Sequence, residues 1–148
     1  MLANRLDFLH QERGKSALAL VRAIKTAKGH INLLVQPLQL GPVDLWKACR
    51  DSHAACQEVH NIIADSSFLF PKSLEEKMLA TRSKLWAILD EATLLLDRSE
   101  QSKQSPFADP NFRNLWKKLQ TEFEPLQTEM IAEIRSLLGA NDEDGRSA

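Results

Sequence analysis

The chain has 148 residues and a nearly balanced charge, with 19 Lys and Arg against 20 Asp and Glu. It contains 23 Leu and 16 Ala but only 5 Gly, 6 Pro and no Tyr, a composition that favours helices over β-sheets. The charge balance argues against a protein that coats nucleic acid, and no stretch is long and apolar enough for a membrane span, so we expect neither role.

The first apolar pattern covers residues 2–35, where apolar side chains recur at steps of three and four. This spacing predicts one long amphipathic helix. The phase of the pattern changes around Gly14, so we expect a kink or a helix boundary there. Arg22, Lys25 and Lys28 lie three residues apart, either as a solvated helix face or as contacts for phosphate, lipid headgroups or an acidic partner.

The second pattern covers residues 43–66, and the face that repeats at helical spacing has smaller and more polar side chains than the faces of the other patterns. Trp46 lies on its edge. Gly41 and Pro42 precede it, and proline is tolerated in the first turn of a helix. We therefore predict a second helix over this range.

The third pattern covers residues 73–98 and begins with Ser73-Leu-Glu-Glu76, which matches a capping box. We therefore predict that the third helix begins at Ser73. Residues 99–108 are rich in Ser, Gln and Lys and lack periodicity, so we expect an exposed loop there.

The fourth pattern covers residues 110–138, after Asp109 as a predicted cap and Pro110 in the first turn. Its apolar stripe includes Leu126, and it ends at Gly139. Pro125 lies inside the pattern and removes a backbone donor, so we expect a kink between residues 121 and 124.

Four amphipathic helices joined by short connections predict an all-α fold, an antiparallel four-helix bundle with one domain over residues 1–139 and a polar, disordered tail over 140–148. At about 1.5 Å per residue the first helix spans roughly 50 Å and the second only about 36 Å. Part of the first helix therefore extends beyond its neighbours, and residues 2–12 are the expected overhang.

The predicted overhang carries an apolar strip made of Leu2, Leu6, Phe8 and Leu9. An exposed apolar strip marks a surface that another molecule covers. We expect it to bind a partner protein or a second copy of the chain, with Trp46 as a further contact. No convincing catalytic set accompanies it, so we expect an interaction protein without a cofactor.

An alternative function is metal or ligand sensing by Cys49, His53, Cys56 and His60, which follow one flank of the second helix at steps of four, three and four. The first and last lie roughly 16 Å apart along the helix, so one ion cannot bind all four and a complete site needs ligands from another helix. The other interpretation is that these side chains pack in or beside the core. The two cysteines are also too far apart to bond to each other, roughly 10 Å, which suits a reducing cytoplasm.

A second alternative is enzymatic, because Arg5-Leu-Asp-Phe-Leu-His10 resembles the Arg-x4-His motif of HEPN-type helical ribonucleases. In that family the Arg and the His face a dimer cleft and act on the RNA backbone. The resemblance covers six residues and implies a metal-independent ribonuclease that uses Arg5 and His10. Read from their positions alone, both side chains lie beside the apolar strip, facing solvent or the margin of the core.

Overall fold

The computed structural model describes the backbone of residues 2–36 and 44–146 and the side chains of 5–36 and 44–139. These residues form helices and no strand, which confirms the predicted all-α class. The elements are α1 (Leu2–Val35), α2 (Leu45–Ser66), the 3-10 turn η1 (Ser67–Leu69), α3 (Lys72–Ser102), the 3-10 turn η2 (Pro106–Ala108), α4 (Pro110–Lys118), the π-helical turn η3 (Leu119–Phe123) and α5 (Glu124–Arg146).

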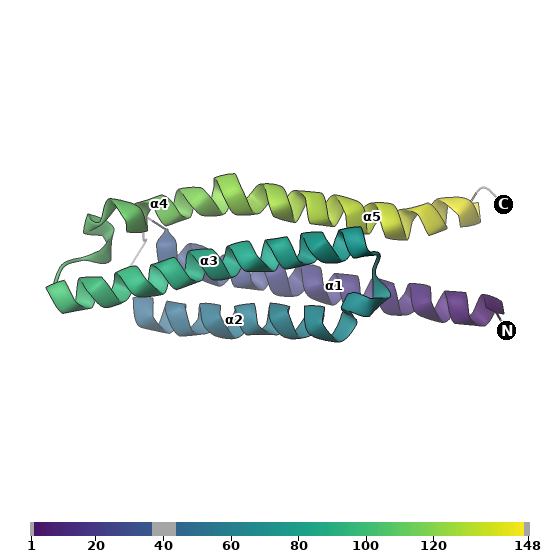
Figure 1. Ribbon diagram of the computed structural model, residues 1–148, viewed down its shortest axis with the longest axis horizontal. Helices are drawn as coiled ribbons and strands as arrows, with labels where there is room; N and C mark the ends of the chain where they lie inside the picture. Colours follow the sequence, from purple (N-terminus) through teal and green to yellow (C-terminus); the bar gives the residue numbers. More distant parts are fainter. Residues whose placement is uncertain (1, 37–43, 147–148) are drawn as a thin grey trace.

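The helices lie side by side along the long axis of the molecule (Figure 1). Each of α1, α2, α3 and the run from α4 to α5 travels in the direction opposite to the one before it. The start of α1 and the end of α5 therefore lie at the same end of the molecule, and both extend past the connection between α2 and α3.

Buried apolar side chains from the helices form one core. The largest fully buried side chains are Phe112, Phe123, Leu20, Ile24, Ile31, Leu34, Ile63, Leu74, Met78, Leu85, Ile88 and Leu89. Removing a side chain of this size from water stabilises the fold by about 1.5–3 kcal/mol. The stripes at helical spacing thus supply the core.

α1 is continuous from Leu2 to Val35, so no helix boundary occurs at Gly14, and a kink there stays a prediction. α2 begins at Leu45, where the Asp44 carboxylate accepts a hydrogen bond from the backbone N–H of Lys47 at 3.0 Å. This aspartate satisfies one of the free N–H groups at the helix start. The expected role of Pro42 in the first turn lies outside the described residues.

The capping box predicted at Ser73 is wrong, because α3 starts one residue earlier and has Pro71 as its N-cap. The Ser73 hydroxyl donates instead to Oε1 of Glu133 in α5 at 2.7 Å, and Nζ of Lys77 lies 2.8 Å from Oε2 of the same carboxylate. A charged acceptor on a neighbouring helix gives a stronger hydrogen bond than a backbone group does.

α3 continues to Ser102, past the predicted end at Arg98, so the start of the expected loop is helical. Lys103 ends the helix in the left-handed conformation, with φ of 56°. The N-cap predicted at Asp109 is confirmed, because its carboxylate accepts a hydrogen bond from the backbone N–H of Asn111 at 2.8 Å.

The irregularity predicted before Pro125 takes the form of the π-helical turn η3, in which the N–H of Glu124 donates to the carbonyl of Leu119. Proline has no N–H, and in a regular helix its ring clashes with the carbonyl of the residue four positions earlier. A wider turn before the proline relieves this clash. The turn also shifts the register, so that Gln127 is buried, whereas Leu126, which the sequence places on the stripe, is half-buried. α5 then passes Gly139, the predicted helix end, and continues to Arg146.

Candidate interaction surface

The N-terminal part of α1 exposes large apolar side chains. Leu6 is 61% exposed and Phe8 is 64% exposed, whereas Leu9 is half-buried and packs against the core. The side chain of Leu2 lies outside the described residues. Leu6 and Phe8 are two residues apart, so their side chains leave α1 on different faces.

The exposure follows from where the other helices end. The Arg13 guanidinium donates a hydrogen bond through Nε to the carbonyl of Leu69, which ties α1 to the turn after α2. Residues 2–12 precede this contact in α1, and Figure 1 shows that the N-terminal end of α1 extends past the connection between α2 and α3. We call residues 2–12 the α1 overhang.

A groove of about 600 Å³ lies where the α1 overhang meets the end of α2. Its apolar walls come from Phe8, Leu9 and Ala19 on one side and from Ile62, Phe68 and Leu69 on the other. Glu12, Lys15 and Asp65 place charges of both signs at the same groove.

Sequence reasoning missed Phe68, which is 80% exposed at the rim of the groove. The segment Phe68-Leu-Phe-Pro71 interrupts the helical pattern, and two of its apolar residues, Leu69 and Phe70, are buried. The sequence signal that could have revealed it is the run of three apolar residues before Pro71. A short turn cannot bury all three side chains, so one of them has to be exposed. The groove therefore has one wall that the sequence predicted, from Phe8 and Leu9, and one that it did not, which includes Phe68.

Trp46 is half-buried and packs against the core near the start of α2. α2 begins at the end of the molecule opposite to the start of α1 (Figure 1). The structure therefore does not bring Trp46 together with the apolar strip.

The four Cys and His side chains of α2 differ in their surroundings. Cys49 and Cys56 are 2% and 1% exposed, and both are free thiols. Cys49 Sγ and His53 Nε2 lie 3.3 and 3.2 Å from the same Thr93 hydroxyl of α3, and the His53 ring lies 5.7 Å from the Trp86 ring.

The fourth of these residues, His60, is exposed, and its Nδ1 lies 3.1 Å from Nη1 of Arg82. Burial, with a smaller contribution from Asp90, raises the pKa of the Cys56 thiol to about 12, and a protonated thiol is a poor metal ligand. The described residues contain no cluster of three or more His, Cys, Asp or Glu side chains that could hold a metal ion. The contacts of Cys49 and His53 with Thr93 are those of side chains that pack helix against helix.

Arg5 is exposed and His10 is half-buried on the α1 overhang. At about 100° per residue the helix turns their side chains roughly 140° apart around its axis.

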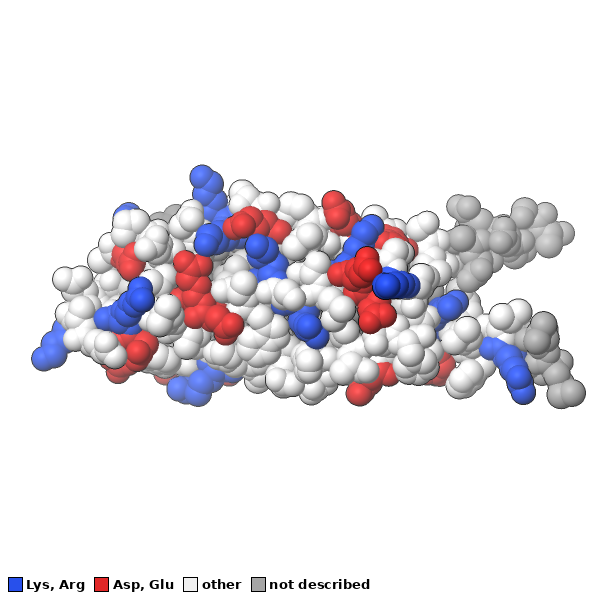
Figure 2. All heavy atoms as spheres, viewed as in Figure 1, with Lys and Arg blue, Asp and Glu red and all other residues white. Residues whose placement is uncertain are grey.

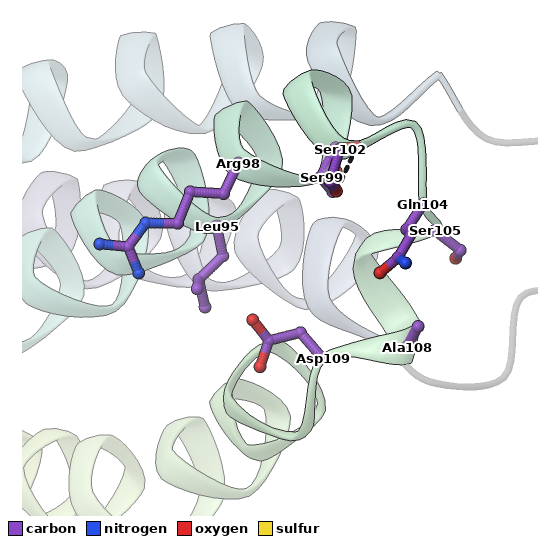
Figure 3. A pocket seen from close by; sticks show the side chains of 8 residues that line it. All are labelled: Leu95, Arg98, Ser99, Ser102, Gln104, Ser105, Ala108 and Asp109. Carbon is purple, nitrogen blue, oxygen red and sulfur yellow. Dashed lines mark hydrogen bonds between the residues drawn. The ribbon is translucent and has the colours of Figure 1, made fainter.

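A second hollow, of about 290 Å³, lies at the opposite end of the bundle, between the end of α3 and the start of α4 (Figure 3). Three serine hydroxyls that line it bond to nearby backbone groups. The Ser99 hydroxyl donates to the Leu96 carbonyl, the Ser102 hydroxyl donates to the Ser99 carbonyl, and the Ser105 hydroxyl accepts from the Phe107 N–H. These bonds close the helix ends.

Charges of both signs are interspersed over the face of the molecule seen in Figure 2. Of the three basic residues that the sequence placed along the first helix, Lys28 pairs with Glu124 of α5 at 2.7 Å. Lys77 and Lys118 likewise pair with acidic residues on neighbouring helices. These lysines therefore have acidic partners within the chain, and each such partly exposed pair contributes little to stability.

Comparison with protein-family models, with curated proteins and with solved structures found no match for this chain. Within the described part of the chain, no helix combines the length and the apolar character that a bilayer crossing requires.

Proposed function

We propose that this chain is a non-catalytic helical interaction module that binds another protein chain through the α1 overhang. The observation that carries the proposal is the exposure of Leu6 and Phe8, at 61% and 64%, on the N-terminal part of α1, whose end extends past the connection between α2 and α3. In this proposal α1 to α5 form an antiparallel bundle that holds the overhang rigidly. The buried free thiols of Cys49 and Cys56 suit a reducing compartment, so we place the protein in the cytoplasm.

The apolar groove beside the overhang supports the proposal, because it offers a concave surface next to protruding side chains. A partner helix that covered Leu6 would remove one large apolar side chain from water, and Phe8, two residues later, faces roughly 160° away around α1 and would be covered only by a separate contact. Burial of each is worth about 1.5–3 kcal/mol, and every 1.4 kcal/mol is tenfold in affinity. One such contact is enough to make binding depend on this surface.

The test compares Leu6→Asp with Leu94→Asp, since Leu94 is 51% exposed on α3, away from the overhang. We expect Leu6→Asp to weaken association at least about tenfold and Leu94→Asp to leave it unchanged. Association is measured by sedimentation velocity of the purified chain and by recovery of bound proteins from the native cell. Circular dichroism checks that both variants keep their helical content.

The proposal is wrong if Leu6→Asp binds as the unaltered chain does, or if Leu94→Asp loses binding equally. The second outcome would indicate that apolar side chains act anywhere on the surface. Leu9 is not used as the test because it packs against the core, and a charge there would disturb the fold.

A further inference from the structure

We propose that the partner of the α1 overhang is a second copy of this chain, joined end to end so that the two overhangs pack against each other in antiparallel orientation. This inference rests on the proposed function and identifies the partner at the same surface. Three features support it: the number of helices at this end of the bundle, the charges along the overhang, and the position of the groove.

Among the described residues, only α1 and α5 continue past the connection between α2 and α3 (Figure 1). A second copy, turned by half a rotation about an axis perpendicular to the bundle, brings its own α1 beside the first α1 in antiparallel orientation. Its α1 then takes the place that α2 leaves empty and reaches the groove beside Phe68.

Leu6 and Leu9 lie three residues apart on α1 and form the seam of the proposed contact, in which Leu6 is exposed and Leu9 is half-buried. Arg5 and Glu12 are seven residues apart, so both lie along the same edge of this seam.

In an antiparallel pair of identical helices, each edge faces the same edge of the other copy. Arg5 of one copy then faces Glu12 of the other, and the two-fold symmetry repeats the pair. The edge is therefore complementary to itself, whereas a partner surface of a single charge sign could satisfy only one of the two residues.

Contacts inside the chain leave these two charges available. Arg5 is exposed, and no ion pair to it occurs among the described residues. Nζ of Lys15 lies 3.6 Å from Oε1 of Glu12, and the Lys15 side chain is 75% exposed. Exposed pairs of this kind contribute little, so a second copy competes with it readily.

The test uses charge reversal in the full-length chain, with association measured by sedimentation equilibrium. Arg5→Glu places two pairs of like charges across the contact, and Glu12→Arg does the same with the opposite sign. We expect each variant alone to dimerise about tenfold more weakly than the unaltered chain. We expect an equimolar mixture of the two variants to recover dimers, because every pair across the mixed contact is again of opposite sign.

The double variant Arg5→Glu with Glu12→Arg should also dimerise as the unaltered chain does. Recovery in the mixture and in the double variant supports the proposal, and failure of either to recover overturns the antiparallel pairing. An unaltered chain that stays monomeric up to about 100 μM overturns the second copy as partner. If Leu6→Asp nevertheless abolishes capture of a different protein, the proposed function survives this failure.

Discussion

The π-helical turn η3 makes a deletion within a helix harmless at one place only. The buried residues of the last helical run are Phe112, Leu115, Leu119, Phe123, Gln127, Met130 and Ile134. Their steps are three, four, four, four, three and four, one residue longer than a regular heptad pattern. We expect that deleting Gln120, an exposed residue of η3, restores regular steps of three and four and keeps every one of these residues buried.

The deletion is made in a Pro125→Ala background, because proline would interrupt the regular helix that replaces the turn. Relative to that background, the free energy of unfolding should change by less than about 1 kcal/mol, since no large apolar side chain leaves the core. The matched control deletes Ala87, an exposed residue in the middle of α3. That deletion turns one half of α3 by about 100° relative to the other, and loses burial of at least three large side chains, about 5 kcal/mol or more.

Urea unfolding followed by far-ultraviolet circular dichroism measures both free energies. The reasoning is refuted if the Gln120 deletion costs as much as the Ala87 deletion. It is also refuted if the Ala87 deletion is tolerated, because a helix without a π turn has no surplus residue to lose.

Two further predictions concern pH. The pKa of Cys56 is raised from its ordinary value of 9.0 to about 12 by burial, so the folded state loses stability between these values, by at most about 1.4 kcal/mol per pH unit. Cys56→Ala should make the urea midpoint decline less steeply above pH 9.0, and an unchanged slope would contradict the assignment. The hydrogen bonds from Lys77 and Ser73 hold the pKa of Glu133 below its ordinary value of 4.5, so stability is lost as the pH falls through that lowered pKa. Glu133→Gln should make the melting temperature fall less steeply as the pH is lowered. An unchanged dependence of the melting temperature on pH would show that other carboxylates cause the loss.

Periodicity predicted most of the fold, because each helix buries one continuous stripe and the stripes are visible in the sequence. It placed the ends less well. Ser73 matched a capping box, yet its hydroxyl bonds Glu133, a residue sixty positions away that no local pattern can reveal. Leu126 matched the stripe, yet η3 turns Gln127 inward, because the register of a helix depends on how the proline is accommodated.

The candidate site could be predicted in part for the same reason. The surplus of apolar residues at Leu6 and Phe8 follows from the lengths of the predicted helices alone. The second wall of the groove could not be predicted, since it depends on which side chain of the turn after α2 remains outside the core, and that side chain is Phe68. Trp46, predicted as a further partner contact, lies near the start of α2, at the other end of the molecule from the overhang, and its role as a contact stays a prediction.

The two helices that extend beyond the α2–α3 connection differ in character, and this difference bears on which of them makes the contact. The sequence at the end of α5, Asn141-Asp-Glu-Asp144, is polar. The overhang of α1 carries Leu6 and Phe8, which polar residues could replace without loss of core packing, because both are more than half exposed. The α1 overhang is therefore the part of this end at which we propose contact with another chain.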